Sequence, residues 1–354
     1  MKIEVRKYRF NFKFDAGTSR GVMTSKDSWF IKLYDYENPG VCGVGECGPL
    51  KGLSVDLKGD LEGAIKNCQN ALSDESNWSV NQIDQFIPIE YPALHFAFET
   101  ALMDFKNKGK RILYYNDFTN SNSAIPINGL VWMGRKDVML SRIKNKIEEG
   151  FTCIKIKIGA INFEDELNLL TYIRSKFDSN QITIRLDANG AFLPDKALTI
   201  LEQLSKYKIH SVEQPIGAGD WDAMRKICTE SPIPIALDEE LVGINGSERK
   251  SQLLDHINPA FIILKPTLVG GLKQSQEWID LASNRGIGWW ITSALESNIG
   301  LNAIAQFTAN HHIAIPQGLG TGQLFSNNIS SPLAIKNGTL IHDNHAGWDL
   351  STLD

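Results

Sequence analysis

Short apolar runs recur along the second half of the chain and alternate with longer amphipathic stretches. The runs are rich in β-branched residues and predict buried strands, while the intervening stretches repeat apolar positions at helical spacing. The predicted strands are IPINGLV (125–131), CIKIKIG (153–159), ITIRLD (182–187), IHSVEQ (209–214), IPIALD (233–238), AFIILK (260–265), WWIT (289–292) and HIAIP (312–316). Strands that alternate with helices in this way predict a (β/α)8 barrel.

A doubly wound parallel sheet is the alternative arrangement of the same elements. Such a sheet would place a glycine-rich GxGxxG loop after its first strand, where this chain has NGLVWMGRKD. The barrel is therefore favoured. Its predicted helices include DVMLSRIKNKIEE, FEDELNLLTYIRSKF, DKALTILEQLSKY and LKQSQEWIDLASNRG. Asn162 stands where the second of these begins and Glu164 and Asp165 follow, which is typical of a helix N-terminus.

The first part of the chain has a different pattern. Residues 1 to about 50 alternate apolar and polar positions with glycine breaks, which predicts an antiparallel meander. Residues 58–76 and 91–108 have helical periodicity, and TNSNSAIP (119–126) is the best candidate for a linker. We therefore expect an α+β domain over 1–120, a barrel over 121–320, and a C-terminal segment, 321–354, that returns to the N-terminal domain.

Composition and charge exclude several classes of protein. The net charge of −5 comes with no block of Lys or Arg, which argues against a nucleic-acid or membrane-surface partner. The N-terminus MKIEVRKYRFNFKFD lacks the apolar core of a signal peptide, and no apolar run reaches membrane length. We expect a cytoplasmic protein, while its oligomeric state stays open.

Cysteine and histidine do not point to a site of their own. The 5 cysteines are odd in number and scattered, so free buried thiols are expected rather than a disulfide framework. The 7 histidines are dispersed as well, so the metal site and the nucleophile are not expected to be built on histidine.

Charged residues stand at the ends of successive predicted strands. They are Lys155 and Lys157 on the second strand, Asp187 on the third, Glu213 on the fourth, Asp238 on the fifth and Lys265 on the sixth. The carboxyl ends of barrel strands meet at one mouth, where barrel enzymes place their chemistry. A single acid there is often only a turn former, and a single lysine often extends to solvent at the rim. Acids on consecutive strands with lysines on both sides indicate a site.

The chemistry of that site follows from its charges. Three converging carboxylates repel one another unless a cation lies between them, and oxygen ligands suit Mg²⁺ or Mn²⁺. Lys155 and Lys157 lie two residues apart, so a strand points both to the same buried face. A cation beside a lysine lowers its pKa, so such a lysine can remove a proton near neutral pH. The pattern predicts proton abstraction from a small carboxylate substrate.

The order Lys-x-Lys, Asp, Glu, Asp, Lys over successive strands resembles the enolase superfamily across essentially the whole chain, and within it the muconate lactonizing enzyme subgroup. The resemblance implies a modified (β/α)7β barrel of the TIM type under an α+β capping domain. It also implies that Asp187, Glu213 and Asp238 bind Mg²⁺, with Mn²⁺ as a possible substitute.

Several stretches look like the o-succinylbenzoate synthase family of the menaquinone pathway. They are GTSRG (17–21), GECGPLKGLS (45–54), LKPTLVGGL (264–272), SALESNIGLNAIAQ (293–306) and GLGTGQLF (318–325). In that family a carbon–oxygen lyase dehydrates 2-succinyl-6-hydroxy-2,4-cyclohexadiene-1-carboxylate to o-succinylbenzoate. The resemblance implies that GTSRG and GECGPL close over the substrate.

Roles for single residues also follow from this resemblance. Lys157 would be the base, Lys155 would neutralise the substrate carboxylate, and Lys265 would stabilise the enediolate from the opposite face. Residues expected to contact the substrate are Thr18, Ser19 and Arg20 in the first motif and Ser293 and Leu295 after the seventh strand.

Other functions stay open. The same residues can racemise N-succinylamino acids, or serve another racemase or epimerase of the superfamily. Dipeptide epimerases of the subgroup have Asp-x-Asp at strand eight, where this chain has HIAIPQG, so a dipeptide substrate is disfavoured. A Schiff-base aldolase would also use a barrel lysine but would not need the three acids. A non-catalytic barrel that only binds metal or a partner leaves the lysines unexplained.

Two further acids lie near the expected mouth. Glu46 either forms a turn in the capping domain or contacts the substrate. Glu296 is expected to make structural hydrogen bonds, because the acid–base positions are already filled.

Overall fold

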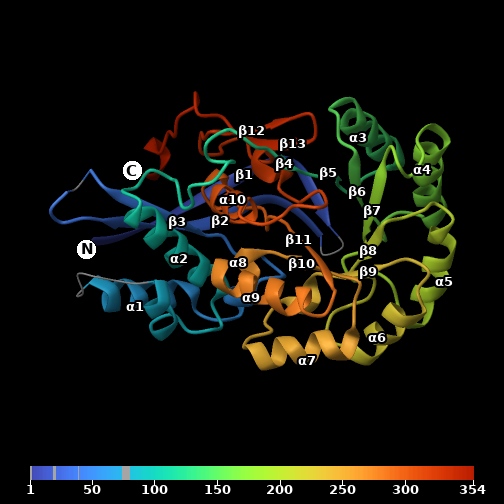
Figure 1. Cartoon of the computed structure of the whole chain (residues 1–354), viewed down its shortest axis with the longest axis horizontal. Coiled ribbons are helices and arrows are strands. Elements are labelled where there is room, and N and C mark those ends of the chain that lie inside the picture. The colour runs from blue at the N-terminus through green and yellow to red at the C-terminus, as the bar shows by residue number, and fades with distance from the viewer. Residues whose placement is uncertain (1, 19–20, 39, 74–79) are drawn as a thin grey trace.

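The computed structural model describes residues 2–18, 21–38, 40–73 and 80–354. An antiparallel sheet with its helices forms one side of the molecule, and a barrel of parallel strands with surrounding helices forms the other (Figure 1). The chain belongs to the α/β class, as the sequence pattern predicted. None of the helices in the described ranges is both long enough and apolar enough to cross a membrane.

The N-terminal domain is built on the predicted meander. Strands β1 (Lys2–Thr18), β2 (Gly21–Tyr34) and β3 (Cys42–Cys47) pair antiparallel in that order. Helix α1 (Leu61–Ser73) confirms the first helical stretch within the described residues, while 74–76 lie outside them, and α2 (Pro92–Lys106) confirms the second. The 3₁₀ turns η1 (Val55–Lys58) and η2 (Val80–Gln85) lie beside these helices. Helix α2 packs closely on β3, because a Cβ on Gly45 would lie only 1.9 Å from the carbonyl oxygen of Ala97.

The barrel sheet contains seven parallel strands in the order β11-β10-β9-β8-β7-β6-β5. Their bounds are β5 (Gly129–Val131), β6 (Cys153–Lys157), β7 (Thr183–Asp187), β8 (Ser211–Glu213), β9 (Ile235–Leu237), β10 (Phe261–Leu264) and β11 (Gly288–Ile291). The helices between and after them are α3 (Lys136–Glu148), α4 (Phe163–Lys176), α5 (Pro194–Ser205), α6 (Trp221–Glu230), α7 (Ser247–Ile257), α8 (Pro266–Val269), α9 (Leu272–Ser283) and α10 (Asn298–Thr308). Asn162 caps α4 as expected, since its side chain accepts from the Glu164 N–H at 2.9 Å.

The prediction of a strand at 312–316 is wrong. These residues form no strand, and the barrel closes instead through isolated bridges from Gln317 to Ile127 and from Gly318 to Thr292. Pro316 has no N–H for a ladder, and the Gln317 side chain itself accepts from the Ile291 N–H at 2.8 Å. Seven strands with this short closure agree with the (β/α)7β barrel that the family resemblance implied.

The predicted first strand, 125–131, divides into two. Strand β4 (Ile125–Pro126) pairs with the C-terminal hairpin of β12 (Leu333–Lys336) and β13 (Thr339–His342), and only β5 joins the barrel. The C-terminal segment also contacts the N-terminal sheet. The Lys13 N–H donates to the Leu324 carbonyl at 2.9 Å, and the Lys32 ammonium donates to the Leu353 carbonyl at 3.0 Å.

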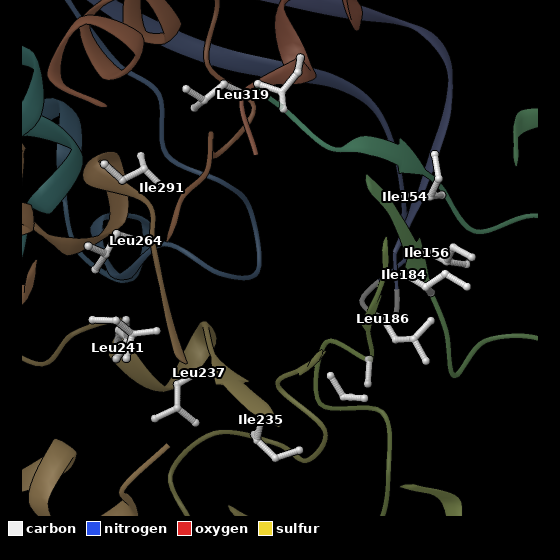
Figure 2. Close-up of a cluster of buried hydrophobic side chains, with 14 of the residues drawn as sticks. Ile154, Ile156, Ile184, Leu186, Ile235, Leu237, Leu241, Leu264, Ile291 and Leu319 are labelled. Atoms are coloured by element: carbon white, nitrogen blue, oxygen red, sulfur yellow. The ribbon is translucent and has the colours of Figure 1, made fainter. Parts of the chain in front are cut away.

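One set of apolar side chains on the barrel strands points away from the barrel axis. Figure 2 shows Ile154, Ile156, Ile184 and Leu186 on one side of the barrel, with Leu264 and Ile291 across from them. Successive side chains on a strand alternate between faces. Lys155 and Lys157 alternate with Ile154 and Ile156 on β6 and therefore point into the barrel. All 5 cysteines are free thiols, as expected.

Candidate active site

The strand ends bring all six predicted charged residues to one place. Strand register sets Lys157 beside Asp187 and Asp187 beside Glu213, so these three end neighbouring strands at the same level. Asp238 directly follows β9 and Lys265 directly follows β10. The three carboxylates are buried, with Asp187 only 1 % exposed. Buried carboxylates need partners that compensate their lost hydration.

Lysines supply those partners. The Lys155 ammonium lies 3.0 Å from Asp187 Oδ2 and 2.6 Å from Glu213 Oε2. The same Asp187 oxygen accepts from Lys157 Nζ at 2.8 Å, and Lys265 pairs with Asp238. Two lysines on one buried face are therefore accommodated because each lies against a carboxylate.

The pKa directions follow from these contacts. Burial alone would raise the pKa of Asp187, but the ammonium groups of Lys155 and Lys157 hold this pKa well below its usual value. Burial raises the pKa of Glu213, and the neighbouring negative charge of Asp187 raises this pKa further. The three ammonium groups match the three carboxylates in number, so a bound cation would take the place of ammonium groups against the acids.

The lysine pKa values shift in the direction opposite to the one expected beside a cation. Burial would lower the pKa of Lys155, but Asp187 and Glu213 outweigh burial and raise it. Asp238 raises the pKa of Lys265 in the same way, against the effect of burial. In the protein alone the lysines face carboxylates, so a lowered lysine pKa would require the charge of a bound cation.

The carboxylate oxygens of Asp187, Glu213 and Asp238 are suitable ligands for a divalent cation, although lysine ammonium groups lie against them in this structure. Within the described residues no three His, Cys, Asp or Glu side chains converge closely enough to hold a metal ion. The carboxylates of Asp187, Glu213 and Asp238 each bind an ammonium group instead. The chemistry of the donor set, carboxylate oxygens from three adjacent strand ends, fits Mg²⁺.

Two side chains at this mouth were missed by the sequence analysis. Asn189 accepts from the Lys157 ammonium at 2.6 Å, and Trp132 places its ring 5.8 Å from the same ammonium. Asn189 lies two residues after the strand-end Asp187, and Trp132 lies two residues after the inward-facing Leu130. The strand period could therefore have indicated Trp132, whereas Asn189 lies in a turn after β7 with a φ angle of +45°, which the strand period does not describe.

A cavity opens over these groups. Its wall is shared by the barrel strand ends and the N-terminal domain, and its lining includes Met23, Leu50, Asn128, Trp132, Lys155, Lys157, Lys265, Ser293, Leu295 and Thr321. Ser293 and Leu295 thus lie where substrate contacts were expected. Of the other expected contacts, Ser19 and Arg20 lie outside the described residues. Thr18 ends β1, and its side chain is not described.

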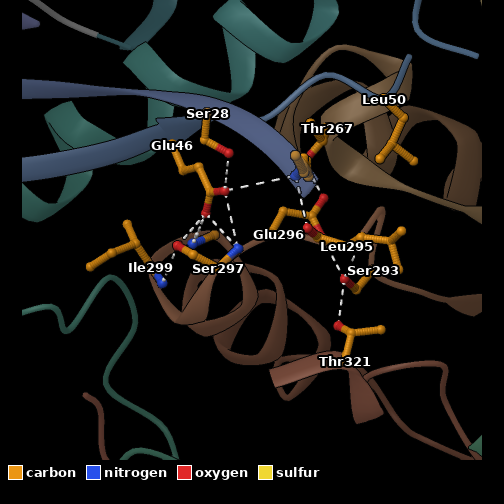
Figure 3. A network of polar contacts seen from close by, with 12 residues as sticks. Ser28, Glu46, Leu50, Thr267, Ser293, Leu295, Glu296, Ser297, Ile299 and Thr321 are labelled. Carbon is orange, nitrogen blue, oxygen red and sulfur yellow. Dashed lines mark hydrogen bonds and ion pairs between the residues drawn. The ribbon is translucent and has the colours of Figure 1, made fainter. Parts of the chain in front are cut away.

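The Ser293 hydroxyl is fully engaged within the protein. It donates to Glu296 Oε2 at 2.5 Å and accepts from the Thr321 hydroxyl at 2.7 Å and from the Leu295 N–H at 3.0 Å. Glu296 also accepts from the Thr267 hydroxyl at 2.5 Å (Figure 3). Glu296 therefore makes the structural hydrogen bonds that were expected of it, and Ser293 serves to fix the local backbone.

Glu46 turns out to be a helix cap supplied by the other domain. It accepts from the Ser297 hydroxyl at 2.6 Å and from the Gly300 N–H at 3.1 Å, at the N-terminus of α10, and from Ser28 at 2.8 Å (Figure 3). A carboxylate suits the positive end of a helix. Because Glu46 is fully buried and its oxygens are occupied, the possibility that it contacts the substrate is not favoured.

Comparisons with known proteins agree with this geometry. The family model described as "Enolase C-terminal domain-like" matches residues 138–350. The o-succinylbenzoate synthase of Desulfotalea psychrophila is 44% identical over 371 aligned residues, which cover 96% of this chain and 98% of that protein.

Solved structures give the same picture of the fold. The crystal structure of MenC from Desulfotalea psychrophila superposes with a TM-score of 0.84 at 40% identity, covering 96% of this chain and 99% of that one. A dipeptide epimerase from Enterococcus faecalis, solved with Mg and the dipeptide L-Leu-L-Tyr, has a TM-score of 0.83 at 20% identity and covers 98% of this chain and 97% of that one. At that identity the epimerase supports the fold alone.

Proposed function

The chain belongs to the enolase superfamily, as its motifs predicted, and from this membership we propose that it is an o-succinylbenzoate synthase. The observation that supports this most directly is the placement of lysines on opposite walls of one cavity. Lys157 ends β6 and Lys265 follows β10, and strands β7, β8 and β9 with their three acids lie between them. The likeness to the Desulfotalea psychrophila synthase over nearly the full length supports the same choice.

The proposed reaction is a dehydration of a cyclohexadiene carboxylate that carries a succinyl arm. Lys157 takes the proton next to the ring carboxylate, and the Asn189 side-chain oxygen accepts from its ammonium form once it has the proton. The same lysine then returns the proton to the hydroxyl group as the carbon–oxygen bond breaks, so that water leaves and the ring becomes aromatic. One group can do both because proton removal and loss of the hydroxyl take place on the same face.

The other lysines stabilise negative charge. Lys155 lies two residues before Lys157 on the same face of β6 and neutralises charge at the substrate carboxylate. Lys265 faces the developing enediolate from the opposite wall of the cavity. Charged groups that are already in place before the reaction stabilise such an anion more strongly than solvent does.

Asp187, Glu213 and Asp238 would hold a divalent cation, Mg²⁺ or Mn²⁺. When bound, the cation would stabilise negative charge on the substrate carboxylate and make the neighbouring proton more acidic. Its positive charge would also replace the ammonium groups that now lie against the acids, which frees the lysines to exchange protons.

A comparison of three substrates tests the proposed function. The succinyl cyclohexadiene carboxylate should be turned over with a higher kcat/KM than an N-succinylamino acid, and a dipeptide should be the poorest. The barrel closure at 312–318 has no acid that could hold a substrate amino group, and a missing polar partner is what rejects an analogue most strongly. Some racemisation of the N-succinylamino acid is allowed, because it keeps an acidic proton beside a carboxylate.

The alternatives make different predictions in the same experiment. Higher kcat/KM with an N-succinylamino acid or a dipeptide would overturn the synthase assignment in favour of a racemase or epimerase. Covalent trapping by borohydride with a carbonyl substrate would indicate a Schiff-base aldolase instead. No turnover of any acidic substrate would favour a non-catalytic barrel.

A further inference from the structure

We propose that Lys26, on strand β2 of the N-terminal domain, is a positioning residue for the substrate-binding segment 293–297 of the barrel. This inference rests on the proposed function, because it assigns a role within that active site. Lys26 does not line the catalytic cavity, whereas Ser293 and Leu295 do. Lys26 therefore acts through the barrel segment that it contacts.

The segment needs support because Leu295 has a left-handed backbone. Its φ angle is +62°, in a region that residues with a Cβ rarely adopt. Such a conformation persists only where the surroundings hold it. The Lys26 ammonium donates to the Leu295 carbonyl at 2.8 Å, while the Leu295 N–H donates to Ser293 Oγ at 3.0 Å. Both polar groups of Leu295 are thereby fixed, one from each domain.

The ammonium is itself held in place. Its side chain is only 3 % exposed and lies 3.8 Å from Glu46, the carboxylate that caps helix α10. Gly48 leaves the room that this arrangement requires, because a Cβ there would lie 2.6 Å from Lys26 Nζ. A buried charge held between a carboxylate and a carbonyl is a strong directional contact. It ties the domain that covers the site to the segment that lines it.

The same strand offers a matched control. Lys32 also lies on β2, is also buried, and also donates to a backbone carbonyl, that of Leu353, at 3.0 Å. Its partners belong to the C-terminal segment rather than to the cavity. Lys26→Met and Lys32→Met therefore remove the same kind of contact from one strand, at the active site in the first variant and away from it in the second.

Kinetics with the succinyl cyclohexadiene carboxylate separate the two variants. Lys26→Met should lower kcat/KM about tenfold or more, because displaced substrate contacts are costly in catalysis. Most of this loss should appear as a raised KM, since Lys157, the lysine that moves the proton, lies on another strand. Lys32→Met should keep kcat/KM near the wild-type value. Equal losses in the two variants, or no loss in Lys26→Met, would overturn the proposal.

Repeating the Lys26→Met substitution in a Leu295→Gly protein tests the role of the Leu295 conformation. Glycine adopts a left-handed backbone freely, so Leu295→Gly removes the need for the Lys26 contact. Replacing Lys26 by Met should therefore lower kcat/KM much less in the Leu295→Gly protein than in the wild type. An undiminished effect of Lys26→Met in that background would show that Lys26 does not act through Leu295.

Amide hydrogen exchange of the protein without substrate gives a readout that is independent of the reaction. The Leu295 and Ser297 amides should exchange faster in Lys26→Met than in wild type or Lys32→Met. Unchanged exchange in Lys26→Met, or an equal rise in both variants, contradicts the proposal. If the wild-type protein does not dehydrate the cyclohexadiene, the proposed function fails, and the exchange experiment still decides whether Lys26 positions the segment.

Discussion

Alternate side chains on strand β6 point to opposite faces and make different contacts. Ile154 and Ile156 pack outward in the hydrophobic core, and Lys155 and Lys157 face the acids inside the barrel. Because the two sets point to opposite faces, the inward lysines can serve chemistry without disturbing the core. Lys265 completes the set from another strand. Replacing these lysines should therefore leave the packing of the core intact and remove turnover, while the melting temperature falls because a buried acid loses its partner.

Replacing either active-site lysine tests the roles proposed for them. Lys157→Ala and Lys265→Ala should each lower kcat by a factor on the order of 10³, because an acid–base group or a charge that stabilises the enediolate is lost. Circular dichroism and the melting temperature should show folded proteins. Lys250→Met is a suitable control, since Lys250 is a fully buried lysine that binds Gln274 and Glu277 away from the site. Near-full activity in either folded lysine variant would refute the assigned role.

Contacts between elements depend on small residues where a helix and a strand approach closely. Helix α2 covers strand β3 at Gly45, and helix α10 receives its cap from Glu46 on the same strand. Strand β3 thus joins the packing of its own domain to the N-terminus of a barrel helix. A side chain at Gly45 would push α2 away and strain both contacts.

Gly45→Ala is expected to destabilise the protein. The added Cβ would meet the Ala97 carbonyl oxygen at 1.9 Å, a backbone atom that cannot move without the helix. Overpacking of this kind destabilises by about 1–3 kcal/mol, which thermal or denaturant unfolding measures. At Gly217 an added Cβ would meet no heavy atom within 4 Å, so Gly217→Ala should leave the unfolding free energy unchanged. Equal stability of the two variants would contradict the close approach of α2 and β3.

The proposed active site is built by the whole molecule rather than by the barrel alone. Met23 and Leu50 of the N-terminal domain line the same cavity as Lys155 and Lys265 of the barrel. The carboxylates of Asp187, Glu213 and Asp238 stand at three neighbouring strand ends, where each lies against a lysine ammonium group. A further cation at this place should support both catalysis and the stability of the folded molecule.

Removal of divalent cations tests this expectation. Chelation should abolish turnover, and Mg²⁺ or Mn²⁺ should restore it. Added Mg²⁺ should also raise the melting temperature, since a ligand that binds only the folded state stabilises it. Asp187→Asn, which removes one proposed ligand charge, should show a smaller rise. Undiminished turnover in a metal-free preparation would contradict the proposed role of the three acids.

The sequence by itself determined the class of fold and the group of charged residues at the mouth. Strand period and the spacing of Lys157, Asp187, Glu213 and Asp238 depend only on local geometry, because parallel strands of similar length end at the same level. The pattern could not indicate that 312–316 would fail to form a strand. That outcome depends on how Gln317 is used by a neighbouring strand.

Only the tertiary structure decided which groups lie against one another across the domains. Glu46 and Ser297 are 251 residues apart, and Lys26 and Leu295 are 269 apart, so no local pattern relates them. The left-handed backbone of Leu295 likewise depends on contacts from outside its own segment. The cap on α10 and the support of segment 293–297 arise when the N-terminal sheet packs on the barrel, because buried charges there must find partners on the other domain.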